Sequence, residues 1–117
     1  MSALDLTRIN AELGRDAQGL TKWALGLGQQ PIVTTNFRPF EAVILHLVTQ
    51  VQPDVPVVWM DNGYNTEATY RFADEVTKQL GLNLRIYLPL RSRAHREAVD
   101  GATPALDDPR HAAFTAE

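Results

Sequence analysis

The sequence predicts an α/β fold in which helices cover both faces of a parallel sheet, as in Rossmann-like domains. Three short apolar segments alternate with segments of helical length, an order typical of βαβ units with right-handed crossovers. The segment VPVVWM at 55–60 is apolar throughout, as expected of a parallel strand that is covered on both faces. With 117 residues, of which 44% are hydrophobic, the chain suffices for one domain at most.

Residues 1–29 are expected to form a helical lead-in to that domain. Two segments carry apolar residues at helical spacing, namely Leu6, Ile9 and Leu13 in the first and Leu20, Trp23, Ala24 and Leu27 in the second. Gly14 is the expected end of the first helix, and Gly26 and Gly28 close the second, because glycine is favoured just past helix ends.

Residues 30–89 are expected to form a βαβαβ core, with strands at about 31–35, 55–60 and 84–88 and helices at about 39–51 and 66–80. Pro39 suits the first position of a helix. The helix that follows it is apolar almost all round, which predicts burial on more than one side. Gly81 is the expected C-terminal cap of the second helix, and Pro89 stops the third strand.

Residues 90–117 are expected to contain a loop and the start of a further helix, and to belong to the same single domain, 1–117. The segment 91–100 is polar and basic and has the length of a short helix. Asp108 and Pro109 have the pattern of an N-cap followed by a first-turn proline, which predicts a helix that begins there.

Winding in one direction places the three strands in the order 3-2-1. The first strand then has an unpaired edge, which is hazardous for a buried apolar strand. A doubly wound sheet would continue on the other side of that strand. The sequence therefore predicts a truncated sheet, either half of a larger domain or one whose edge another chain covers.

The composition of the chain argues against several classes of function. The net charge of −3 and the pI of about 5.5 argue against a general nucleic-acid or membrane-surface binder. No apolar segment is long enough to cross a bilayer and no secretory signal is visible, which favours the cytoplasm. The chain contains no cysteine, which excludes disulfides, thiolate chemistry and cysteine-ligated metals within these residues.

Two polar loops follow the first two strands and form the candidate site. The first runs from Thr34 to Phe40 and leads into a helix N-terminus, where unpaired N–H groups and the helix dipole favour an anion. Arg38 adds a guanidinium group suited to phosphate or sulfate. The second is Asp61-Asn62-Gly63. Each loop is also compatible with a simple connection, and this alternative stays open.

The remaining polar residues give weaker signals. His46 lies in the apolar helix and is interpreted as structural. His95 and His111 have no metal-ligand spacing, so we assign neither a metal nor a catalytic residue. The arginines at 91, 93 and 96 follow the third strand, where they form either a solvated face or a rim that steers anions.

Residues 30–89 resemble a known family. The segments PIVTTNFRPFEAVILHL, VPVVWMDNGYNTEATYRFADEV and LGLNLRIYLP are similar to the phosphoadenosine phosphosulfate (PAPS) reductase family. Its members have the adenine nucleotide alpha hydrolase-like, PP-loop fold. They typically carry a loop of the type SSSFGAEDAVLLHL and a second of the type LDTGYLFPETYRF. The spacing between the two motifs also agrees.

The resemblance implies a set of substrate-binding residues. Thr34, Thr35 and Asn36 stand where the family's loop serines bind phosphate or sulfate oxygens, followed by Phe37. Arg38 stands in place of the loop glycine, so it fills space and brings a cation. In the second motif, the implied residues are Trp59, Met60 and Asp61 at the adenine and Gly63 in the loop.

The resemblance also implies a reaction. Family members reduce PAPS or adenylyl sulfate (APS) to sulfite, with thioredoxin or glutaredoxin as reductant, through a cysteine in a C-terminal ECGLH-type motif. That motif is expected beyond Glu117, so this chain would bind the nucleotide without performing the redox step. Two alternatives stay open: an ATP-dependent PP-loop adenylating enzyme, and a degenerate nucleotide-binding or interaction module. A homodimer is compatible with each.

Overall fold

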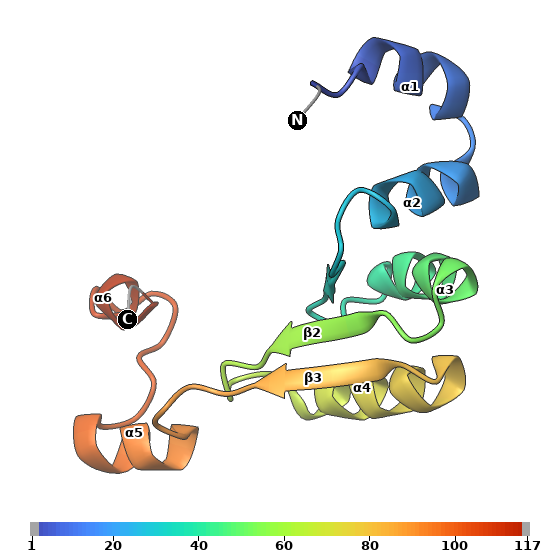
Figure 1. The fold of residues 1–117 in the computed structure, drawn as a ribbon. Coiled ribbons are helices and arrows are strands. Elements are labelled where there is room, and N and C mark those ends of the chain that lie inside the picture. Colours follow the sequence, from blue (N-terminus) through green and yellow to red (C-terminus); the bar gives the residue numbers. More distant parts are fainter. Residues whose placement is uncertain (1–2, 116–117) are drawn as a thin grey trace.

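A computed structural model describes residues 3–115, which form six helices and three strands. Their arrangement is drawn in Figure 1. The elements, in chain order, are α1 (Leu6–Leu13), α2 (Ala17–Leu25), β1 (Val33–Thr34), α3 (Glu41–Val51), β2 (Pro56–Met60), α4 (Glu67–Leu80), β3 (Asn83–Tyr87), α5 (Arg93–Asp100) and α6 (His111–Thr115).

The strands form one parallel sheet in the order β1-β2-β3, which confirms the predicted order. Val33 of β1 lies opposite Val57 of β2, and Val57 lies opposite Leu84 of β3. The first strand is shorter than expected, with two residues in place of about five. Among the described residues its outer edge has no partner strand, so β1 is paired on one side only.

The core lies on one face of the sheet, where α3 and α4 pack together. It contains Phe37, Leu45 of α3, Val57 and Trp59 of β2, Ala73 and Val76 of α4, and Leu82. Residues that alternate with these on β2 project from the opposite face, where Val58 is half-buried and Met60 is 70% exposed. The described part of the chain therefore leaves that face open to solvent.

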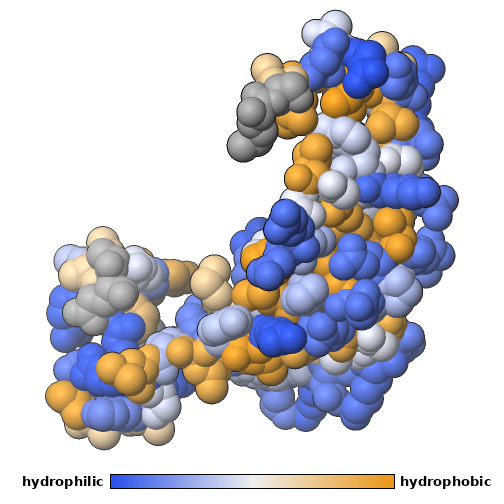
Figure 2. Space-filling view, viewed as in Figure 1, coloured by the Kyte–Doolittle hydropathy of each residue, from blue (hydrophilic) through white to orange (hydrophobic). Residues whose placement is uncertain are grey.

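The expectation that α3 is buried on more than one side is wrong for this chain. Leu45 and Val48 are buried, but Val43 is 68% and Ile44 is 56% exposed. The reason is that the packing of α2 against α3 is incomplete: a hollow remains beside β1, and Ile44 lines it together with residues of α2 and β1. Figure 2 shows apolar residues reaching the surface along this part of the molecule.

Two helices begin two residues later than the prolines at which they were predicted to start. The helix expected from Pro39 begins at Glu41, because Glu41 N–H donates to the Arg38 carbonyl and closes a turn first. The helix expected from Asp108-Pro109 begins at His111, whose N–H donates to the Asp108 carbonyl.

Most helix ends follow the sequence signals. Asp5, Asp16, Thr66 and Ser92 each accept a backbone N–H from three residues ahead, which caps α1, α2, α4 and α5. Gly81 ends α4 in a left-handed conformation with φ +61°, as expected for a glycine at this position.

The molecule is extended. Its radius of gyration is 18.5 Å, whereas a compact domain of this length has about 13 Å. The α1–α2 pair and the α5–α6 pair project from the sheet layer as two arms, with α5 and α6 beyond the carboxyl ends of the strands (Figure 1). In residues 3–115, none of the helices combines the length and apolar character that crossing a membrane requires.

Candidate functional site

A cleft of about 390 Å³ opens where β1 and β2 end. The carboxyl ends of parallel strands are where open α/β sheets bind ligands. The lining comes from the loop after β1, the end of β2 and the start of α4, and it consists of Asn36, Phe37, Arg38, Pro39, Trp59, Met60, Asn62, Asn65 and Thr69. The two loops predicted to lie side by side therefore face one cavity.

The side chain of Glu41 accepts hydrogen bonds from the first loop. Its Oε2 accepts the Thr35 hydroxyl at 2.7 Å and the Asn36 N–H at 2.7 Å, and the Thr35 Oγ1 in turn accepts the Phe37 N–H at 3.0 Å. Burial raises the pKa of Glu41. The hydrogen bonds from Thr35 and Asn36, a further hydrogen bond from the Arg38 N–H, and the positive charge of Arg38 together have the larger effect, so the pKa of Glu41 is lowered overall.

Phe37 fixes the loop to the core. It is 2% exposed and adopts φ +54°, a left-handed conformation that a phenylalanine rarely takes. Its ring meets Trp59 edge-on with centroids 5.0 Å apart, and Trp59 in turn contacts Tyr70 at 5.8 Å. Aromatic contacts of this kind stabilise beyond the buried area alone, so they offset the backbone strain and set the floor of the cleft.

The second loop is organised by Asp61, which is 7% exposed. Its Oδ1 accepts hydrogen bonds of 2.9 Å from Gly63 N–H, Asn65 Nδ2 and the Tyr70 hydroxyl. Gly63 has φ +83°, which favours glycine at this turn. Burial, then the hydrogen bond to Asp61 and the Asp61 charge, raise the pKa of the Tyr70 hydroxyl. Asp61 therefore shapes the loop more than it faces the cleft.

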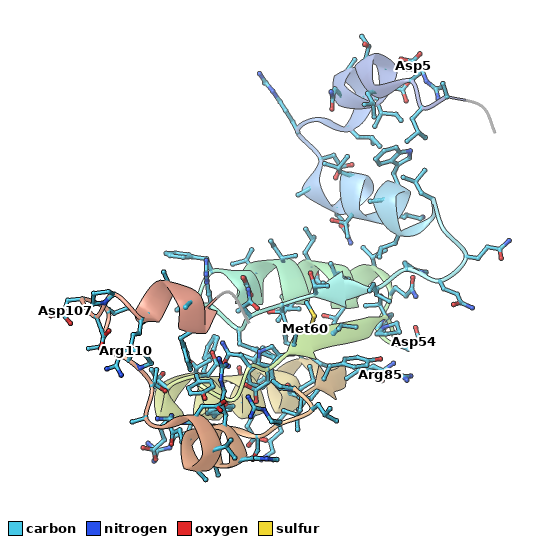
Figure 3. All side chains as sticks on the ribbon, turned by 90° about the vertical axis from the view of Figure 1, so that its left-hand side faces the viewer. Asp5, Asp54, Met60, Arg85, Asp107 and Arg110 are labelled. Carbon is cyan, nitrogen blue, oxygen red and sulfur yellow. The ribbon has the colours of Figure 1, made fainter. Side chains whose placement is uncertain are left out.

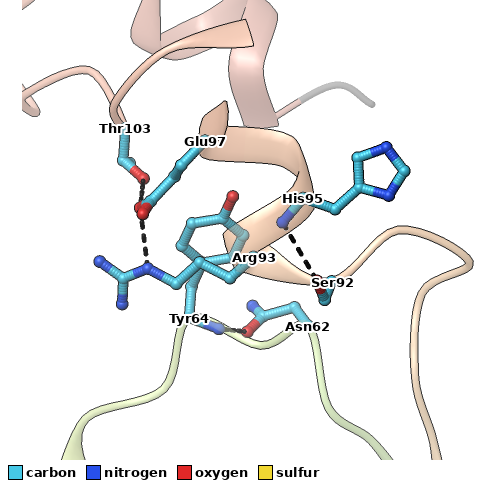
Figure 4. Close-up of polar contacts among 7 residues, drawn as sticks. All are labelled: Asn62, Tyr64, Ser92, Arg93, His95, Glu97 and Thr103. Atoms are coloured by element: carbon cyan, nitrogen blue, oxygen red, sulfur yellow. Dashed lines mark hydrogen bonds and ion pairs between the residues drawn. The ribbon is translucent and has the colours of Figure 1, made fainter. Parts of the chain in front are cut away.

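The helix α5 packs over the second loop. Figure 4 shows Asn62, whose side chain accepts the Tyr64 N–H, beside Arg93, which is bonded to Glu97. The Arg93 guanidinium lies 5.1 Å from the centroid of the Tyr64 ring. This contact attaches the α5 arm to the loop that borders the cleft.

The arginines after β3 are engaged locally. Arg91 pairs with Asp100 and Arg93 with Glu97, while Arg96 donates to the Phe114 carbonyl and lies over its ring. These contacts favour the solvated face over a rim that steers anions. Arg38 differs, because it is exposed at the cleft and has no ion-pair partner within residues 3–115.

The structure divides the nine predicted site residues into two groups. Five line the cleft: Asn36, Phe37, Arg38, Trp59 and Met60. Four do not: Thr34 faces a separate hollow beside the β1 edge, Thr35 is buried with its hydroxyl bonded to Glu41, Asp61 lines a second hollow beside the cleft, and Gly63 lies in the adjoining turn.

Sequence reasoning did not select Asn65, Thr69 or Glu41. Thr66 caps α4 and thereby places Asn65 just before the helix and Thr69 in its first turn, so the cap signal at Thr66 was the available clue. A second hollow of about 290 Å³ adjoins the cleft and shares Met60 and Asn62 with it; Tyr87, Leu88 and Pro89 make it mostly apolar. Within residues 3–115 no cluster of side chains is suited to hold a metal ion.

Comparison with known proteins places the chain in a family. Residues 30–107 match the phosphoadenosine phosphosulfate reductase domain. The chain is 47% identical over 98 residues to the phosphoadenosine 5′-phosphosulfate reductase of Synechococcus sp., covering 82% of this chain and 42% of that protein. It is 48% identical over 99 residues to the enzyme of the same name from Xanthomonas campestris pv. campestris, with 83% and 41% covered.

The fold also matches a solved structure. A crystal structure of phosphoadenylyl-sulfate reductase from Candida auris, in complex with phosphate, superposes with a TM-score of 0.75 at 20% identity, covering 99% of this chain and 57% of that one. This likeness confirms the predicted parallel α/β, Rossmann-like fold class, although within residues 3–115 the core helices α3 and α4 cover one face of the sheet only. The chain spans about two fifths of the length of the curated relatives, which agrees with the predicted truncation. It belongs to the phosphoadenosine phosphosulfate reductase family.

Proposed function

We propose that this chain binds an adenylylated sulfate, PAPS or APS, as the nucleotide-holding part of a reductase-like protein of sulfate assimilation. The cleft at the ends of β1 and β2 supports the proposal, because it combines the exposed guanidinium of Arg38 with the amide side chains of Asn36, Asn62 and Asn65. Cationic and amide donors of this kind suit phosphate and sulfate oxygens.

The adjoining apolar hollow supports the same proposal. It shares Met60 and Asn62 with the polar cleft, so one ligand with a flat apolar part and a charged part would span both. An adenylylated sulfate has this division of chemistry. The curated relatives carry the name phosphoadenosine 5′-phosphosulfate reductase, which agrees with an adenine nucleotide as ligand.

The reduction itself is assigned to a cysteine outside these 117 residues, none of which is cysteine. Reduction by a covalent route needs a thiolate to attack the sulfate sulfur. We further propose thioredoxin or glutaredoxin as reductant, as the family resemblance implies, and a cytoplasmic location, which the composition of the chain favours. The chain's own contribution is to bind and orient the nucleotide.

Calorimetry with adenosine 3′,5′-bisphosphate, APS and ATP tests the proposal. Arg38→Ala is expected to weaken binding of the bisphosphate by about tenfold or more, because it removes a charge-assisted contact. Arg8→Ala in α1 removes the same charge far from the cleft and serves as the matched control.

Equal loss in the two variants would contradict the assigned site, and failure of the wild type to bind any of the three ligands would contradict the function. Preference for ATP with release of pyrophosphate would instead indicate an adenylating enzyme.

A further inference from the structure

The loop after β1 already holds an anion, which is the carboxylate of Glu41. Its Oε2 accepts one hydroxyl and one backbone N–H, from Thr35 and Asn36, both at 2.7 Å. These are the donor types that a phosphate-binding loop offers to an oxyanion. The Glu41 carboxylate therefore occupies the position in which those two donors would receive a ligand oxygen.

Some of the backbone N–H groups at the N-terminus of α3 also have hydrogen-bond partners within the chain. Glu41 N–H donates to the Arg38 carbonyl and Val43 N–H donates to the Phe40 carbonyl. The residue at the N-cap position, Phe40, makes no side-chain cap. The negative charge of Glu41 in the first turn satisfies the helix dipole in place of an external anion.

The carboxylate can leave this position more readily than its donors can. Glu41 is half-buried, so its side chain has a route to water. Thr35 is 6% exposed and Phe37 is 2% exposed, which keeps the loop backbone fixed. The charged group that faces Glu41 from its own loop is Arg38, which would attract an incoming oxyanion to the same place.

We propose that Glu41 is a built-in competitor for the ligand's oxyanion: its carboxylate occupies the Thr35 and Asn36 donors until a phosphate or sulfate group displaces it. The inference rests on the proposed function and adds a residue that sets anion affinity. It predicts that the chain binds oxyanions less tightly than its donor set allows.

Glu41→Gln and Glu41→Ala test the competition. Glutamine keeps an acceptor oxygen for the loop but removes the charge, and alanine vacates the position. Each variant is expected to bind adenosine 3′,5′-bisphosphate about tenfold more tightly, the value of one charge-assisted hydrogen bond, while binding of uncharged adenosine stays unchanged. Glu75→Gln, at an exposed glutamate of α4, makes the same charge change and is expected to have no effect.

If the role of Glu41 is merely structural, its variants would bind both the bisphosphate and adenosine more weakly. This result, or an unchanged affinity for the bisphosphate, would overturn the inference while leaving the proposed function intact. Absence of bisphosphate binding in the wild type and in every variant would refute both.

A measurement on the wild type covers the case in which the variants fold poorly. On titration with the bisphosphate, the Asn36 amide and the Glu41 side-chain carboxyl resonances are expected to shift together in NMR spectra, because displacement breaks the 2.7 Å bond between them. Saturation by the bisphosphate without movement of either resonance would count against displacement.

Discussion

Replacement of Asp61 by alanine tests how the second loop is held. One oxygen of this 7% exposed carboxylate accepts hydrogen bonds from Gly63, Asn65 and Tyr70. A net contribution of about 1 kcal/mol for each bond gives a loss of about 3 kcal/mol in the free energy of unfolding. For a chain of this size that corresponds to a fall in Tm of about 10 °C.

Urea unfolding followed by tryptophan fluorescence measures this loss, since Trp59 lies against Tyr70. Tyr70→Phe alone is expected to cost about 1 kcal/mol, and the double variant should fall short of the sum of the singles by about the same amount. Asp74→Ala is the matched control, because its ion pair with Lys78 is exposed and worth at most about 0.5 kcal/mol. A loss below about 1 kcal/mol for Asp61→Ala, or exact additivity with Tyr70→Phe, would refute the reasoning.

Two further predictions concern the core and the C-terminal arm. Leu45 of α3 is 1% exposed, so Leu45→Ala is expected to lower the free energy of unfolding by about 3 kcal/mol. Val43→Ala, on the exposed side of the same helix, should change it by no more than about 0.5 kcal/mol. Equal losses in urea unfolding would contradict one-sided packing of α3. Hydrogen bonds from Arg110 lower the pKa of Asp108 to about 2, so a carboxyl ¹³C titration should find it there, and Arg110→Ala should return it toward 3.8. Arg110 lies on the arm, at the end of the molecule opposite Asp54 and Arg85 (Figure 3). A pKa of Asp108 that is unchanged by Arg110→Ala would exclude this pairing.

The features that could be predicted from the sequence are those with a local cause. Apolar spacing and the glycines at 14, 26 and 81 gave the helix positions to within about two residues, because capping and periodicity act over a few neighbouring residues. The strand order followed from winding successive βαβ units in one direction, because consecutive elements usually lie beside each other in space.

The inner arrangement of the site could not be obtained in this way. The Thr35 hydroxyl binds Glu41 six residues further on, and this contact depends on a loop in which Phe37 adopts a left-handed conformation. Phenylalanine does not favour that conformation, so no propensity rule predicts the loop. In this structure the Thr35 hydroxyl is consequently bonded to Glu41, a partner that its residue type does not indicate.

The exposed side of α3 and the open edge of β1 have one common cause. Apolar side chains of Ile32, Ile44 and Val48 line a hollow of about 620 Å³ that runs beside β1, with α2 on its other side. Parallel strands are normally buried on both sides and both faces, and a strand of two residues with a free edge contributes little stability by itself. The sequence of α3 is apolar on the side that this chain leaves exposed, so its composition matches a fuller sheet than three strands provide. We therefore expect the free edge of β1 to be a site where a further strand can pair, which would cover the exposed side of α3.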